Sequence, residues 1–269
     1  CWRINYANEF HLDIAPSIPN PLCREGGELV PDRKLRTWKA TNPKGYRRWF
    51  EERAALQPMI LLYETKMAGT RAEVEALPGP TRFKGVLRRC VQLFKRHRDV
   101  FFAARAPELA PISIILTTLA ARSYAHCVTR NRYETELDLL VDVLRNMPAF
   151  VERAYVEGRE QYFVWNETTA GENFAEKWNT DPRLAESFFL WQQQALQDFQ
   201  TPLTAAGLDE VRSQLSVWLG KDVTGKALAS VSEGVTAKRT AGQLTVTPGI
   251  GLTATSIGTA VRPNTFFGR

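Results

Sequence analysis

The sequence predicts an α+β protein in which a few strands are followed by a mainly helical region. Residues 1–40 are strand-like and are interrupted repeatedly by proline, which ends regular strand pairing. From residue 44 to about residue 219, apolar side chains recur with the period of an α-helix. A short run of strands followed by many helices favours an α+β fold over alternating β and α units.

Three changes in composition divide the chain. We assign residues 1–42 to a strand region, residues 43–220 to a helical domain and residues 221–269 to a tail. The tail is rich in Gly, Thr, Ala and Val and shows no helical period. We predict a flexible tail, because such a segment cannot bury enough apolar surface to offset the cost of ordering it.

The helical domain can be divided further. Asn42-Pro43 is a typical cap and first residue for a helix over 43–56. Residues 84–102 place Leu87, Cys90, Val91, Phe94 and Phe101 on one face, as in a helix packed on a core. The next helix should start at Pro111, with Ile112, Ile115, Leu116 and Leu119 as its apolar stripe. Further helices are expected at about 133–157, 182–207 and 207–219.

Charge and cysteine usage exclude some classes of protein. Of the net charge of +6, residues 221–269 carry +4, which argues against a duplex-binding face on the body. The four cysteines lack C-x-x-C spacing, which argues against zinc and favours a reducing, cytoplasmic setting. No stretch reaches the ~18–20 uncharged apolar residues that a membrane span needs.

Asp13 is the first candidate functional residue. In the strand pattern "FHLDI" at 10–14, His11 and Asp13 share one side of the strand. Asp13 is either an exposed strand aspartate or a ligand for Mg²⁺, a hard cation that prefers carboxylate oxygens. One aspartate cannot hold two ions, and residues 1–12 contain no strand D-x-D or E-x-D that would supply partners.

Lys95 and Ser113 form a second candidate. "LFKRHRDVFF" at 93–102 precedes the helix that begins near Ser113, so the two side chains could lie on neighbouring helices. An ammonium group beside a hydroxyl at a helix N-terminus can bind a triphosphate. Arg96 and Arg98 are close enough in sequence to take the role of Lys95, and the alternative is a solvated helix face.

Five segments, in this order, resemble one family. They are "FHLDIAPSIP", "LRTWKATNPKGYRRWFEE", "LRRCVQLFKRHRDVFF", "APISIILTTLAA" and "WNETTAGENFAEKW". Together they resemble the bacterial cGAS/DncV-like nucleotidyltransferases, or CD-NTases, of the anti-phage signalling systems called CBASS. The resemblance covers roughly residues 4–220.

The resemblance implies roles for individual residues. Residues 1–42 would be the end of a polymerase-β-like catalytic core, and Asp13 the third of three carboxylates that hold two Mg²⁺ ions, with Mn²⁺ as a substitute. The family's G-S motif and its strand D-x-D have no counterpart in this sequence, so we expect a C-terminal portion that is inactive alone. Lys95 and Ser113, with Arg96 beside them, would bind the triphosphate.

The segment "WNETTAGENFAEKW" at 165–178 resembles an element beside the active-site cleft. Asn166 and Asn173 could therefore contact nucleotide. The alternative is that Asn173 caps a short helix and that Trp165 and Trp178 are packing residues.

The expected activity is synthesis of a cyclic di- or trinucleotide from NTPs, by in-line attack of a ribose hydroxyl on an α-phosphate. The product would act on a downstream effector. Many relatives work beside a ubiquitin-transferase-like protein that joins their C-terminus to a target, although Gly268 is followed here by Arg269. A linear, template-independent nucleotidyltransferase and a non-catalytic interaction protein are the alternatives.

Overall fold

The computed structural model describes residues 2–6, 10–23, 26–32, 36–61, 85–201, 208–243, 245–247, 251–253 and 259–260. The chain forms two compact units, residues 1–203 and residues 204–269, and each is described by itself. Among the described residues, no helix is both long enough and apolar enough to cross a membrane.

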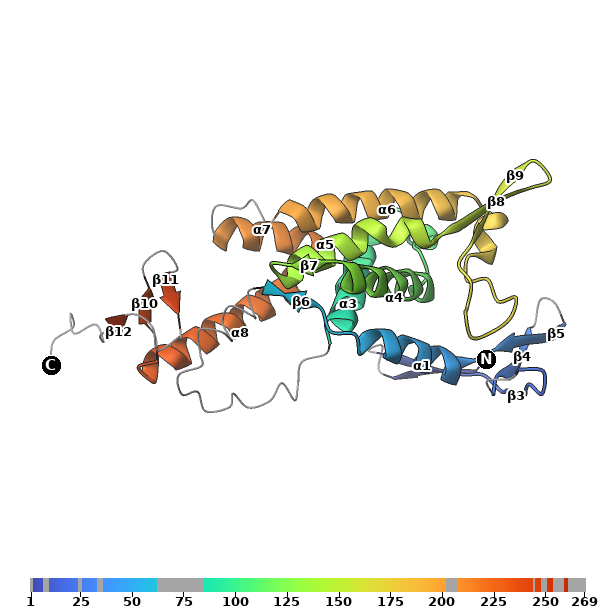
Figure 1. The fold of residues 1–269 in the computed structure, drawn as a ribbon, viewed down its shortest axis with the longest axis horizontal. Coiled ribbons are helices and arrows are strands. Elements are labelled where there is room, and N and C mark those ends of the chain that lie inside the picture. The colour runs from blue at the N-terminus through green and yellow to red at the C-terminus, as the bar shows by residue number, and fades with distance from the viewer. Residues whose placement is uncertain are drawn as a thin grey trace. The chain divides into compact units, whose positions relative to one another are not determined.

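Short antiparallel strands open the first unit (Figure 1). β1 (Trp2–Tyr6) pairs with β2 (Phe10–Ile14), and β2 ends just before Pro16. β4 (Glu28–Asp32) lies between β3 (Ile18–Pro19) and β5 (Thr37–Thr41) in a separate sheet. The prediction of proline-interrupted strands over residues 1–40 is confirmed.

Helix α1 (Pro43–Ala54) begins where the sequence predicts. Asn42 is its N-cap, and the Oδ1 atom of Asn42 accepts a hydrogen bond of 2.8 Å from the backbone N–H of Gly45. Pro43 occupies the first helical position, where its missing N–H leaves no helical hydrogen bond unmade. Asn42 is buried, so this cap is fixed inside the unit.

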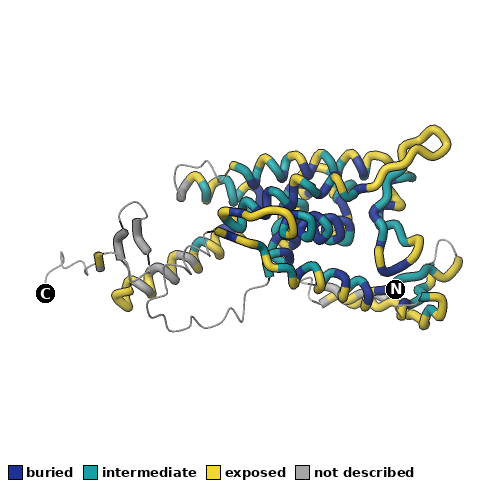
Figure 2. The backbone as a smooth tube through the Cα atoms, in the orientation of Figure 1, coloured by how far each residue is buried: buried dark blue, intermediate teal, exposed yellow. Residues whose placement is uncertain are grey.

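Four helices carry most of the apolar core that the structure describes in this unit: α3 (Val86–Ala103), α4 (Ser113–Arg130), α5 (Glu136–Asn146) and α6 (Arg183–Gln200). Helix α4 packs on α1, α3 and α5, and α6 packs on α3 and α5. Figure 2 shows buried residues concentrated on the facing sides of these helices. They are joined by the short 3-10 helices η1 (Pro107–Leu109), η2 (Met147–Phe150) and η3 (Glu176–Asn179), and β6 (Met59–Ile60) pairs in parallel with β7 (Arg132–Tyr133).

The expected apolar faces of α3 and α4 are confirmed with one exception. Leu87, Phe94, Leu116 and Leu119 are fully buried. Ile112 was expected in the α4 stripe, but it is the N-cap residue and is 49% exposed. Its extended backbone precedes the first helical turn, so the helical period does not apply to it.

The prediction of one helix over 133–157 is wrong in its second half. Helix α5 ends at Asn146, and β8 (Glu152–Val156) and β9 (Arg159–Phe163) form an antiparallel hairpin. Glu157 and Gly158 at its turn have φ angles of +50° and +74°. Positive φ at both central residues is the geometry that joins twisted antiparallel strands, and glycine adopts it without strain.

A buried histidine joins α3 to α6. The Nε1–H group of Trp191 donates to Nδ1 of His97 (3.0 Å), so the proton of the neutral ring is on Nε2, which donates to Asp198 (2.9 Å). Burial lowers the pKa of His97, and the hydrogen bond to Asp198 only partly opposes this effect. His97 therefore serves as a neutral, fully bonded core residue, a role that the sequence pattern of α3 did not reveal.

The second unit contains more regular structure than the sequence predicted. Helix α7 (Leu208–Leu219) packs on α8 (Lys221–Thr240), and β10 (Thr245–Thr247) pairs with β11 (Gly251–Thr253) and β12 (Thr259–Ala260). The expectation that no helix forms after residue 221 is wrong over α8. This helix mixes valine, threonine, serine and glycine with charged residues and has no continuous apolar stripe, which is why no helical period was visible. The C-terminal "NTFFGR", including Gly268 and Arg269, lies outside the described residues.

Candidate functional site

Arg98 connects α3 to the beginning of α4. Its guanidinium group donates to the Oδ1 atom of Asp99 (2.9 and 2.6 Å), to the carbonyl oxygen of Pro111 (2.8 Å) and to the Oγ atom of Ser113 (3.1 Å). Asp99 therefore forms a local ion pair with Arg98. The remaining donors of Arg98 hold the start of α4 against α3.

Ser113 is the first residue of α4 and is exposed. The N-cap residue Ile112 has no side chain that could accept a hydrogen bond from the first turn. The N-terminal end of a helix carries unpaired N–H groups and a partial positive charge, which together favour an anion. Ser113 thus places a hydroxyl group at a helix end that attracts negative charge.

Lys95 lies one helical turn before Arg98 on α3. Its side chain is half-buried and makes no hydrogen bond or ion pair with any residue in the described part of the chain. Burial lowers the pKa of Lys95, the charge of Arg98 lowers it further, and Asp99 partly opposes the shift. An unpaired cation beside a second cation is stabilised by an anionic ligand. We refer to Lys95, Arg98 and Ser113 as the α3–α4 clamp.

The clamp differs in one respect from the sequence prediction. Lys95 and Ser113 do lie on helices that pack together, but the residue that contacts Ser113 is Arg98. Arg96 is exposed on the same turn of α3. Arg98 was named only as a neighbour of Lys95, because a sequence pattern does not show which of three nearby cations reaches across to the next helix.

Asp13 lies near the end of β2, and its backbone pairs in register with Arg3 of β1. The placement of its side chain, and that of His11, lies outside the described part of the structure. Among the described residues, no three His, Cys, Asp or Glu side chains gather closely enough to hold a metal ion. The metal role of Asp13 stays a prediction.

Glu167 binds a loop to two helices. Its carboxylate accepts hydrogen bonds from Nε1 of Trp49 (2.6 Å) and Nη2 of Arg53 (2.9 Å) on α1, and from Nε of Arg122 (3.0 Å) on α4. Arg122 also donates to the carbonyl oxygen of Trp165 (2.8 Å). The loop of residues 165–175, which we call the Glu167 loop, is thereby fixed to both helices.

The same loop also contacts the strand region. Nδ2 of the cap residue Asn42 donates to the carbonyl oxygen of Thr168 (3.2 Å), and Lys39 on β5 pairs with Glu176 just beyond the loop (2.9 Å). Tyr46 on α1 packs edge-on against Phe174. These contacts join residues more than a hundred positions apart in the sequence, so the loop connects the strand region to the helices.

Asn166 uses its side chain entirely within the Glu167 loop. Its Oδ1 atom accepts from the backbone N–H (3.0 Å) and the hydroxyl (2.8 Å) of Thr168, and its Nδ2 group donates to Thr169 (3.3 Å) and Glu172 (2.7 Å). It is also buried. In this conformation Asn166 has no donor or acceptor left for a nucleotide.

Asn173 is bonded in a similar way. Its Oδ1 atom accepts from the backbone N–H groups of Val164 and Ala175 (both 2.9 Å), and its Nδ2 group donates to the carbonyl oxygen of Tyr162 (3.0 Å). It therefore fixes the turn that leads into η3. Trp178 is buried and Trp165 stacks on Phe163, as the packing interpretation expected.

Comparison with known proteins adds independent information. No protein-family model matches the chain. Over 276 aligned residues the chain is 29% identical to a c-di-GMP synthase of Roseivirga ehrenbergii, an alignment that covers 100% of the chain and 68% of that protein. It is 31% identical over 138 residues to the cyclic dinucleotide synthase CdnG of Bradyrhizobium diazoefficiens, covering 46% of the chain and 33% of that protein.

The fold agrees with these alignments. The structure of the B. diazoefficiens CD-NTase CdnG in complex with GTP matches with a TM-score of 0.58 at 19% identity, covering 84% of this chain and 66% of that chain. The chain is therefore similar in sequence to cyclic dinucleotide synthases and similar in fold to a CD-NTase. The mixed architecture of strands followed by helices that the sequence predicted agrees with the fold of that structure.

Sequence reasoning missed several residues of this chain that shape the site. Glu167, Arg122, Arg53 and Trp49 form one bonded group across three segments, yet none was a candidate. The available signal was the carboxylate in "WNET", beside the two asparagines that drew attention instead. Its partners lie 45 to 118 positions away, a separation at which a single sequence gives no pairing information.

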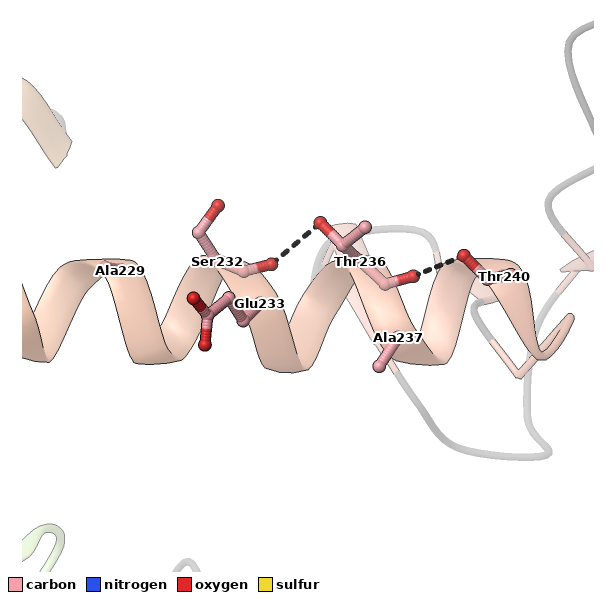
Figure 3. A pocket seen from close by; sticks show the side chains of 6 residues that line it. All are labelled: Ala229, Ser232, Glu233, Thr236, Ala237 and Thr240. Carbon is pink, nitrogen blue, oxygen red and sulfur yellow. Dashed lines mark hydrogen bonds between the residues drawn. The ribbon is translucent and has the colours of Figure 1, made fainter.

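A hollow along α8 is not a second candidate site (Figure 3). It lies on one helix and is lined by Ala229, Ser232, Glu233, Thr236, Ala237 and Thr240. The hydroxyls of Thr236 and Thr240 donate to backbone carbonyl oxygens one turn earlier (2.8 and 3.0 Å). The one charged lining residue is the acid Glu233, so the lining has no positive charge that would attract a nucleoside triphosphate.

Proposed function

We propose that this chain supplies the triphosphate-binding helices, and one metal-binding carboxylate, of an enzyme that converts NTPs into a cyclic dinucleotide. The observation that carries the proposal is the α3–α4 clamp. Lys95, which makes no hydrogen bond or ion pair with the described residues, lies one turn before the arginine that bonds to Ser113 at a helix N-terminus. The relatives named above, a c-di-GMP synthase and a cyclic dinucleotide synthase, support the same activity. A cyclic trinucleotide is the neighbouring alternative.

Each clamp residue has a distinct task in this proposal. The Lys95 ammonium neutralises phosphate charge, and the Ser113 hydroxyl with the first N–H groups of α4 donates hydrogen bonds to phosphate oxygens. Arg98 holds Ser113 and the start of α4 in place through its bonds to Ser113 and Pro111. Fixing the triphosphate orients its α-phosphate for attack by a ribose hydroxyl.

The metal part of the proposal rests on the resemblance. Two Mg²⁺ ions would stabilise the attacking and leaving oxygens. The described residues do not assemble such a site, and Asp13 is one carboxylate, so no step of the proposed reaction is routed through metal. If Asp13 binds metal, the substitution Asp13→Asn should lower turnover, because it keeps the shape of the side chain and removes its charge.

Turnover by the complete natural protein tests that role. We expect Asp13→Asn to lower turnover by ~10²–10⁴-fold without changing the far-UV circular dichroism, a loss typical of removing a main electrostatic contributor. Turnover close to that of the unmodified enzyme would make Asp13 a scaffold residue.

The product assay separates the proposed activity from its rivals. The complete natural protein is incubated with labelled GTP or ATP and Mg²⁺, and the products are treated with phosphatase. A cyclic product has no terminal phosphate and is unchanged by the phosphatase, whereas a linear product loses its terminal phosphates. A linear product would identify a linear nucleotidyltransferase. The absence of any product would favour a non-catalytic interaction protein. Residues 1–269 alone, with Asp13 as their one assigned metal ligand, are expected to give no product.

The wider role follows from the resemblance to the anti-phage enzymes. We propose that the product activates a downstream effector and that a ubiquitin-transferase-like partner acts on the C-terminus. Because α8 extends to Thr240, removing residues 261–269 is a cleaner test than a longer deletion. Synthesis should be unchanged and covalent adducts in cells should disappear; lost synthesis would assign the C-terminus to the folded enzyme.

A further inference from the structure

A hollow of about 540 Å³ lies at the opposite end of α4 from the clamp. Its walls come from the last residue of α4, from β7, from α5 and from Gln200 at the end of α6. A helix rises about 1.5 Å per residue, so Arg130 lies about 26 Å along α4 from Ser113. The hollow has the size of a small-molecule site and shares no residue with the α3–α4 clamp.

The carboxylates of this hollow are already committed to internal contacts. Asp142 accepts hydrogen bonds from the hydroxyl of Tyr133 (2.7 Å) and the side chains of Asn131 (3.1 Å) and Asn146 (3.2 Å). Burial alone would raise the pKa of Asp142, but the hydrogen bonds from Tyr133 and Asn131 outweigh it and lower the pKa. Asp138 closes the capping box at Thr135, the N-cap of α5.

The arginines of the hollow make fewer hydrogen bonds than its carboxylates do. Arg132 is exposed and makes no side-chain hydrogen bond or ion pair with the residues that the structure describes. Arg130 is exposed and contacts the ring of His126. Arg145 is half exposed and gives one hydrogen bond, of 3.1 Å, to Asp142. Each guanidinium group has five N–H donors, so most of these donors have no partner in the part of the chain that the structure describes.

We propose that this hollow binds a small phosphorylated molecule. Three guanidinium groups face two carboxylates whose acceptors are largely occupied, which leaves a surplus of charged donors in a concave site. Planar guanidinium groups match phosphate oxygens in geometry and charge. The polar side chains of Asn131, Tyr133 and Gln200 complete the lining and make it unsuited to an apolar ligand. This binding is independent of the proposed reaction at the clamp.

Pyrophosphate binding to residues 1–269 tests the proposal by isothermal titration calorimetry at low ionic strength. Lys95→Met is present in every sample, so that the clamp contributes little. The double variant Arg132→Gln/Arg145→Gln removes two charges from the hollow. The matched control, Arg159→Gln/Lys177→Gln, removes two charges from exposed positions on β9 and η3.

We expect the hollow variant to bind pyrophosphate about tenfold more weakly or worse, and the control to change by less than about twofold. Equal weakening in both double variants would show general charge attraction and overturn the proposal, as would unchanged binding or no binding at all. Arg132→Gln alone breaks no side-chain bond among the described residues, so its affinity remains readable if the double variant folds poorly. Unchanged affinity in that single variant would also contradict the site.

Discussion

The α3–α4 clamp and the Glu167 loop both consist of polar side chains at the junction of several segments, yet they differ in how those side chains are used. In the loop, Asn166 makes four hydrogen bonds and the Glu167 carboxylate accepts three. In the clamp, Lys95 makes none with the described residues, and Ser113 is exposed at an uncapped helix end.

The difference separates structural polar groups from groups available to a ligand. A buried polar group must be bonded, because leaving it unpaired costs about 1–3 kcal/mol. Groups that satisfy one another inside the protein therefore hold the fold together. A half-buried cation left unpaired next to another cation gains from an incoming anion. The loop should thus control stability, and the clamp should control nucleotide affinity.

Asn166→Ala should have the largest effect on stability. It removes a buried acceptor from the backbone N–H and hydroxyl of Thr168, and a donor from Glu172. We expect the free energy of unfolding to fall by about 2–4 kcal/mol in urea titrations. Asn166→Asp should also destabilise, because it places a carboxylate against Glu172. A stable Asn166→Ala protein with weakened GTP binding would restore the nucleotide-contact hypothesis.

Glu167→Ala should have the next largest effect on stability. It leaves the Nε1–H group of Trp49 and two guanidinium groups without their common acceptor, but Glu167 is 40% exposed and water replaces part of the loss. We expect about 2 kcal/mol of destabilisation and faster proteolysis of the Glu167 loop. The matched control is Glu52→Ala, an exposed acid of α1, which should change stability by less than about 0.5 kcal/mol. An equal loss of stability in both variants would show that the Glu167 contacts do not stabilise the fold.

Acid should weaken the α3–α6 contact through His97. Its pKa is lowered in the folded state, so below the unfolded value of about 6.5 the unfolded chain binds the proton more readily. Stability from this group is fully present above that pH and is lost as the pH falls toward the folded pKa, by at most about 1.4 kcal/mol per pH unit. Urea titrations at pH 7.5 and 5.5 should show this loss, and His97→Gln should reduce the difference. An unreduced difference would assign the pH effect to other groups.

The features that could be predicted from the sequence are those that local patterns determine. The Asn42-Pro43 start of α1, the apolar face of α3 and the strands before residue 42 follow from capping, period and proline placement. The hairpin after α5 was missed because apolar residues around 150–156 fit a helical period, and the Glu157–Gly158 turn that breaks it is short.

The candidate site was predictable only in part. Lys95 and Ser113 stand out by residue type, but the bond that joins α3 to α4 comes from Arg98, and three nearby cations cannot be ranked without the helix packing. The Glu167 contacts depend on tertiary pairing alone. Asn166 looked like a ligand because polar loop residues often are, and only the structure shows where its hydrogen bonds go.

GTP affinity measured together with stability in Lys95→Met and Glu167→Ala tests the central claim most directly. Methionine keeps the half-buried stem of Lys95 and removes its charge. We predict that Lys95→Met weakens GTP binding by about tenfold with unchanged stability, whereas Glu167→Ala lowers stability more than it lowers affinity. Lys177→Ala, an exposed lysine of η3, should leave both unchanged. Unaltered affinity in Lys95→Met, or an equal loss in Lys177→Ala, would show that Lys95 is a solvated helix-face residue and not a phosphate ligand.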